Sequence, residues 1–135
     1  MFWLSHHTRE EWHRCYRLGP LRVCARCLGV YPTMFAALVT LFAVQAPLEW
    51  AHDVPVVLAL TLPATADWAF GRFRPHAFSN PWRTFTGVLL GLGLGRSLFI
   101  HLQRPFPAAL FAQFVLVTVV ALPVILATYR RSRRA

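Results

Sequence analysis

Three cysteines near the start of the chain have the spacing of metal ligands. Cys24 and Cys27 form a CxxC motif, and Cys15 precedes it. The two sulfurs of such a motif can bind one tetrahedral ion, and Cys15 is near enough along the chain to supply a third thiolate. The spacing predicts a zinc site. The cysteines leave three alternatives open, which are an iron–sulfur cluster, a redox-active dithiol and a segment without a cofactor.

Structural zinc takes four ligands, so the site needs a donor beyond the three thiolates. His13 lies two residues before Cys15 and is the first candidate, with His6 and His7 as alternatives further upstream. A water or a substrate can also take the fourth position, as in catalytic zinc sites.

A second group of residues carries side chains suited to binding an anion. They are Arg26, Tyr31, Asp67, Asn80, Arg83 and Thr86. Each lies at an end of an apolar stretch, and these ends are expected on the same side of a membrane. We therefore predict a polar pocket next to the metal, with guanidinium groups for a phosphate or a carboxylate. In the alternative interpretation, Asp67 pairs with Arg83 or Arg26 and only holds the helix ends together.

The elements that must position these residues are four apolar stretches. Hydrophobic residues make up 56% of the 135 positions, and only five residues are acidic. The stretches cover residues 28–46, 54–70, 85–102 and 108–129. Each is close to the ~20 residues that a helix needs to cross the hydrocarbon core of a bilayer. The pattern predicts four membrane-spanning helices.

The arginines predict the orientation of these helices. The net charge is +9, and the basic residues gather before the first stretch, between the second and third, and after the fourth. By the positive-inside rule these three segments are cytoplasmic. The fold class predicted is therefore all-α, an integral membrane four-helix bundle with both termini cytoplasmic. Residues 1–27 form a cytoplasmic Cys/His segment, 28–129 the transmembrane domain and 130–135 a basic cytoplasmic tail.

Two features of the third stretch predict helix contacts. Gly87, Gly91 and Gly95 recur every fourth residue and form one small-residue face, which favours close packing within the monomer or between copies in a homo-oligomer. Arg96 lies inside the same stretch, and we expect it to reach Glu49 or Asp53 at the opposite side of the membrane.

The motifs together resemble a known family. The sequence Cys-Ala-Arg-Cys-Leu-Gly-Val-Tyr at 24–31, Asp67-Trp68 and the segment 79–87 are similar, in the same order, to motifs of the small predicted bacterial membrane proteins grouped as domain of unknown function 2085 (DUF2085). The resemblance spans Cys15 to Gly95. It implies a multi-pass protein of the bacterial inner membrane and brings no established activity. Many members have histidine directly after the first cysteine, where this chain has Tyr16.

The sequence thus favours a membrane protein that binds or transports an anionic small solute or a lipid headgroup beside a cytoplasmic zinc site. The alternatives are a metal- or thiol-dependent membrane enzyme and a small membrane scaffold subunit. Membrane lipid is the expected surrounding partner. Nucleic acid is not expected, because aromatic and basic residues are not interleaved in the basic tail.

Overall fold

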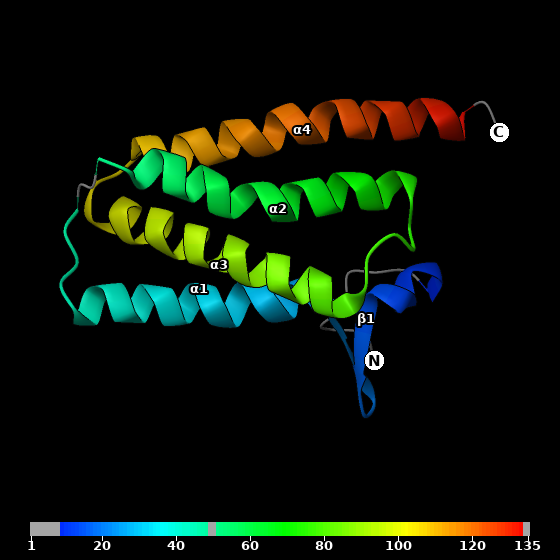
Figure 1. Ribbon diagram of the computed structural model, residues 1–135, viewed down its shortest axis with the longest axis horizontal. Helices are drawn as coiled ribbons and strands as arrows, with labels where there is room; N and C mark the ends of the chain where they lie inside the picture. Colours follow the sequence, from blue (N-terminus) through cyan, green and yellow to red (C-terminus); the bar gives the residue numbers. More distant parts are fainter. Residues whose placement is uncertain (1–8, 49–50, 134–135) are drawn as a thin grey trace.

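The computed structural model describes residues 9–48 and 51–133. Four long helices follow a short N-terminal segment (Figure 1). They are α1 (Ala25–Ala43), α2 (Asp53–Phe73), α3 (Asn80–Gln103) and α4 (Ala108–Ser132). All four are long and apolar enough to span a membrane. The prediction of a bundle of four such helices is confirmed.

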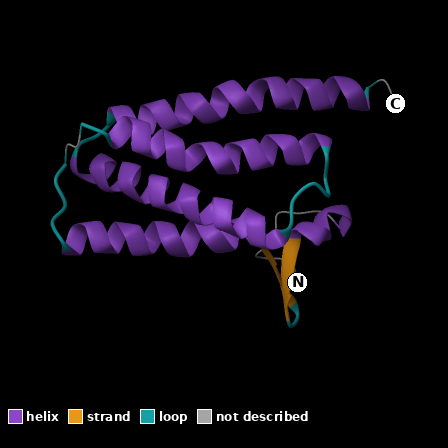
Figure 2. Cartoon of the chain, in the orientation of Figure 1, coloured by secondary structure: helices purple, strands orange, loops and turns teal. Residues whose placement is uncertain are grey.

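The N-terminal segment is not wholly helical. The 3₁₀ helix η1 (Arg9–Arg14) leads into a hairpin of β1 (Cys15–Leu18) and β2 (Leu21–Cys24), drawn in orange in Figure 2. Gly19 and Pro20 form its two-residue turn, and Gly19 has a φ of 60°. A positive φ at the first turn position is a hairpin geometry that glycine adopts at no steric cost. The expected all-α class therefore holds for the bundle but not for this segment.

The helices lie side by side in the order α1, α3, α2, α4 (Figure 1). α3 packs against both α1 and α2, whereas α4 packs mainly on α2 and touches α3 little. The hairpin, the loop between α2 and α3, and the last turn of α4 lie at the same end of the bundle, which we call the hairpin end.

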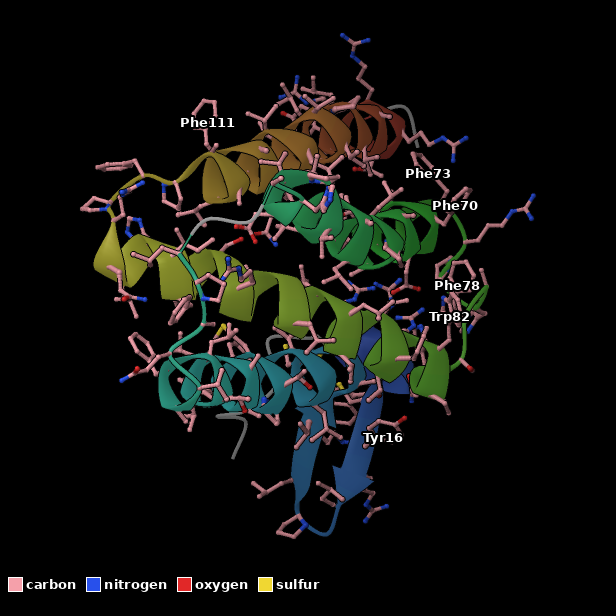
Figure 3. All side chains as sticks on the ribbon, turned by 60° about the vertical axis from the view of Figure 1, so that its left-hand side comes forward. Tyr16, Phe70, Phe73, Phe78, Trp82 and Phe111 are labelled. Carbon is pink, nitrogen blue, oxygen red and sulfur yellow. The ribbon has the colours of Figure 1, made fainter. Side chains whose placement is uncertain are left out.

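The large apolar side chains of the outer helices point outward. Phe35 on α1 is 58% exposed, and Phe111 on α4 is 71% exposed and projects away from the bundle in Figure 3. The buried side chains lie mainly on α2 and α3 and include many polar groups. An apolar surface around a polar interior is the arrangement expected of helices surrounded by lipid.

α3 begins five residues earlier than its apolar stretch predicted. The Ser79 hydroxyl accepts a hydrogen bond from the backbone N–H of Trp82, and Pro81 occupies the first turn. A serine cap with proline just inside is a strong start signal for a helix. Asn80 and Arg83 therefore belong to α3, and not to the preceding loop.

The glycine face of α3 contacts α1 within the chain. A Cβ atom added at Gly87 would lie 2.5 Å from the carbonyl oxygen of Arg26, and one at Gly91 would lie 2.6 Å from that of Val30. From the other side, a Cβ at Gly29 would lie 2.2 Å from the carbonyl oxygen of Thr84. The two backbones are therefore in direct contact, as small residues permit. Pairing of two copies of the chain through this face was also predicted. The structure of a single chain does not test that prediction.

This contact predicts that Gly29→Ala weakens the bundle. The new methyl group has no space against the α3 backbone, so we expect a loss of about 1–3 kcal/mol in the free energy of unfolding. Gly71→Ala is the matched control, because no atom beyond the adjacent residues and the backbone of its own helix lies within 4 Å of the added Cβ. Thermal unfolding of both variants in detergent measures the difference. Equal stability of the two would contradict the backbone contact.

Candidate functional site

The hairpin carries two of the three cysteines, and the third, Cys27, lies in the first turn of α1. The hairpin register pairs Cys15 with Cys24, and Cys24 immediately precedes α1. Residues paired in this way have Cα atoms ~4.5–5.5 Å apart. No disulfide joins any of the three cysteines. Across residues 9–48 and 51–133, no three His, Cys, Asp or Glu side chains are grouped so as to hold a metal ion.

His13 contacts the loop between α2 and α3. Its Nε2 atom lies 3.2 Å from the carbonyl oxygen of Pro75, and its ring centroid lies 4.6 Å from that of His76. His13 is thus not grouped with the cysteines as a metal ligand. His6 and His7 lie outside the described residues. The nitrogen ligand that the sequence predicted is therefore not identified.

Asp67 forms a buried ion pair with Arg26. The carboxylate is 3% exposed and accepts a hydrogen bond from Nη2 of Arg26. The pair joins the hairpin end of α2 to the first turn of α1. Of the two partners that the sequence suggested for Asp67, the structure selects Arg26.

Arg83 is also buried, at 5% exposure, and it has no carboxylate partner in the described part of the chain. Its Nη2 donates to the carbonyl oxygen of Pro75 at 3.0 Å, and its buried Nε has no hydrogen-bond partner. The charges of Arg14, Asp67 and Arg26 all act on this guanidinium. Asp67 pairs with Arg26 through one carboxylate oxygen, and among the described residues Arg83 forms no ion pair of its own.

Arg14 is a member of this cluster that the sequence did not single out. It precedes β1, and its Nη2 donates to the carbonyl oxygen of Gly71 at 2.8 Å near the end of α2. Arg14, Arg26 and Arg83 come from three separate segments, and we call them the arginine cluster. The only sequence signal for Arg14 was its position in an arginine-rich segment next to Cys15.

Hydrogen bonds connect the hairpin to the start of α3. The Asn80 amide donates to the carbonyl oxygen of Cys15 at 3.4 Å. The Thr84 hydroxyl lies 3.0 Å from the carbonyl oxygen of Ala25 and 3.2 Å from the hydroxyl of Tyr16, which Figure 3 labels on the hairpin. Asn80 is thus near the cysteines, as predicted, and its contact is with backbone. The role of Thr84 was missed, because a lone threonine in an apolar helix carries no distinctive signal.

Two of the predicted pocket residues face elsewhere. Tyr31 is 56% exposed on the surface of α1. It follows Arg26 by five residues, which places it about 140° away around the helix. Thr86 is fully buried, and its hydroxyl donates to the carbonyl oxygen of Arg83 in its own helix at 3.1 Å.

A second ion pair lies at the opposite end of the bundle. The guanidinium of Arg96 on α3 donates to both carboxylate oxygens of Asp53 on α2, with distances of 2.7 and 2.9 Å. The prediction that Arg96 reaches an acid on the far side is confirmed for Asp53. Glu49 lies outside the described residues.

Comparison with known proteins agrees with this architecture. Residues 7–97 match the family described as predicted membrane protein (DUF2085). The chain belongs to this family. No curated protein and no solved structure matches it. Within this DUF2085 chain, the position after the first cysteine is Tyr16, whose hydroxyl contacts Thr84 and therefore helps to dock the hairpin on α3.

The Asp67 contacts predict a selective coupling with Arg26. Arg26→Gln leaves the buried Asp67 carboxylate unpaired, at a cost of about 3–5 kcal/mol, and Asp67→Asn leaves the partly buried Arg26 guanidinium unpaired, at a smaller cost. The double variant removes both charges, so it should recover much of that stability. A double-mutant cycle of unfolding free energies in detergent measures the recovery.

The matched cycle pairs Asp67→Asn with Arg83→Gln. Because Arg83 donates to Pro75 and not to Asp67, the coupling there should be smaller. A larger coupling with Arg83 than with Arg26 would contradict the assigned ion pair.

Proposed function

We propose that this membrane protein binds a small anion at the arginine cluster. The observation that carries the proposal is Arg83, a buried guanidinium without a carboxylate partner in the described residues. A buried charge that lacks an opposite charge is costly to a folded protein. An anionic ligand compensates that cost, since it supplies the missing negative charge when it binds.

The chemistry of the side chains indicates the class of anion. A guanidinium is planar and presents paired N–H donors that match the two oxygens of a carboxylate or a phosphate. The Nε of Arg26 and the Nε of Arg83 are both buried and without hydrogen-bond partners. We therefore propose a phosphate or carboxylate group as ligand.

The location of this site follows from the distribution of arginines. The arginine cluster lies at the hairpin end, and the loop between α2 and α3 and the last turn of α4, with Arg130 and Arg131, lie at the same end. Cytoplasmic arginines are enriched in membrane proteins. We propose that the hairpin end faces the cytoplasm, so the anion enters from that side.

The proposal predicts saturable anion binding that depends on Arg83. Inorganic phosphate and succinate, titrated into the purified protein, should raise its melting temperature and give a binding isotherm. Arg83→Gln should weaken affinity by roughly tenfold or more, because a hydrogen bond to a charged group contributes about 1.5–3 kcal/mol. Arg72→Gln is the matched control, since Arg72 is exposed and lies near the same end.

Stability without ligand separates an anion-binding arginine from a structural one. If Arg83 serves a ligand, Arg83→Gln should change the ligand-free melting temperature little, since it removes an unbalanced buried charge along with one hydrogen bond. Equal loss of affinity in Arg83→Gln and Arg72→Gln would contradict the site. So would the absence of saturable binding in the unaltered protein.

Zinc at the three cysteines is a second proposal, supported by their spacing and by the register that pairs Cys15 with Cys24. Metal binding of this kind is coupled to folding, so the thiols would turn toward the ion as it binds.

Protein purified without chelators should hold about one zinc per chain, and Cys24→Ser should lose most of it. His13→Asn should keep the metal, because His13 contacts Pro75. Elemental analysis measures the zinc content of the unaltered protein and of both variants. Unaltered protein with no metal and three freely titrating thiols would reject a zinc site.

A further inference from the structure

An apolar pocket that opens to the outside of the bundle adjoins Arg26 of the arginine cluster. Its volume is about 250 Å³, roughly eight times the space that one water occupies in the liquid. The walls come from all four helices, with Ala64 and Trp68 on α2, Leu90 on α3, and Val117 and Ala121 on α4. The pocket lies where α4, which packs mainly on α2, leaves α3 partly uncovered.

Arg26 belongs to both the pocket and the arginine cluster. Its side chain lines the pocket, its Nη2 pairs with Asp67, and its Nε is buried without a hydrogen-bond partner. One polar hydroxyl, that of Thr65, also lines the pocket, and it donates to the carbonyl oxygen of Thr61 in its own helix. The pocket is therefore bordered by the guanidinium of Arg26, which it shares with the arginine cluster, and otherwise by mainly apolar side chains.

We propose that the ligand is an anionic amphiphile, with its phosphate or carboxylate head at the arginine cluster and its hydrocarbon chain in the apolar pocket. This inference rests on the proposed anion site and specifies its substrate class. A small free anion would occupy only the arginine cluster. An amphiphile complements both parts, because its charge lies at one end and its apolar surface along the rest.

The surroundings supply such molecules. Val117 lines the pocket and is 41% exposed on the outside of the bundle, where the helix surface is apolar. In a bilayer, that surface faces acyl chains. A lipid chain can therefore reach the pocket without crossing a polar barrier, while its head stays at the level of the arginines near the membrane surface.

A series of alkyl phosphates tests the inference. Methyl, butyl and octyl phosphate are titrated into the protein held in amphipol, without free detergent, and affinity is measured by calorimetry. We expect affinity to rise at least tenfold from methyl to octyl phosphate. Ala121→Phe, which fills the pocket, should remove this gain and leave the affinity for methyl phosphate unchanged. Ala127→Phe is the matched control, because Ala127 is exposed on the same helix and does not line the pocket.

Trp68 gives a second measurement that does not require a pocket-filling variant. An octyl phosphate brominated on its chain should quench the fluorescence of the unaltered protein, and Trp68→Phe should lose that quenched component. Quenching that is the same in both proteins would overturn the placement of the chain.

The outcomes separate this inference from the anion site itself. If methyl phosphate binds through Arg83 and chain length has no effect, the site takes free anions and the amphiphile is rejected. If no alkyl phosphate binds, the amphiphile is rejected, and if inorganic phosphate and succinate do not bind either, the anion site is rejected as well. If octyl phosphate binds with the same affinity in Arg83→Gln as in the unaltered protein, the head is not held by the arginines and the inference is overturned.

Discussion

Backbone contact between α1 and α3 positions the whole hairpin end of the molecule. Gly29 lies against the backbone of Thr84, and Gly87 lies against that of Arg26, so neither helix can move away without losing the contact. Small residues make this approach possible, since in lipid helix association depends on close packing and not on hydrophobic burial. Arg26 and the cysteines on either side of it are thereby held beside the start of α3.

Buried charge is distributed unevenly along the bundle. Among the described residues, an ion pair lies at each end, Arg26–Asp67 at the hairpin end and Arg96–Asp53 at the other. Both acids lie on α2, so α2 is connected to α1 at one end and to α3 at the other. Ionisable groups are expensive in a membrane and persist where they are paired or functional. Arg83 is a buried arginine that belongs to neither pair. Among the described residues, the hairpin end therefore has a buried positive charge without a carboxylate partner.

The hairpin connects the cysteines with the arginine cluster. It holds Cys15 opposite Cys24, it places Arg14 against the end of α2, and its Tyr16 contacts Thr84. A ligand bound at the arginine cluster would therefore lie next to the hairpin, which carries Cys15 and Cys24. On this proposal, the adjoining apolar pocket would extend the site into the membrane, so the ligand would contact both the aqueous surface and the bilayer.

The sequence by itself determined the family, the four helices and the ion pair of Arg96 at the end opposite the hairpin. Hydrophobic length and isolated charges are local signals, and the membrane constrains both, because a helix must be long enough to span it and a charge inside it needs a partner. It also indicated that Asp67, Asn80 and Arg83 lie at one end. Only the tertiary structure decided that Asp67 pairs with Arg26, that Tyr31 points outward, and that Arg14 and Thr84 join the cluster. Those choices depend on the rotation of each helix and on the docking of the hairpin, which follow from contacts between residues distant in sequence. The pocket beside Arg26 has the same origin, since it exists only where four helices meet.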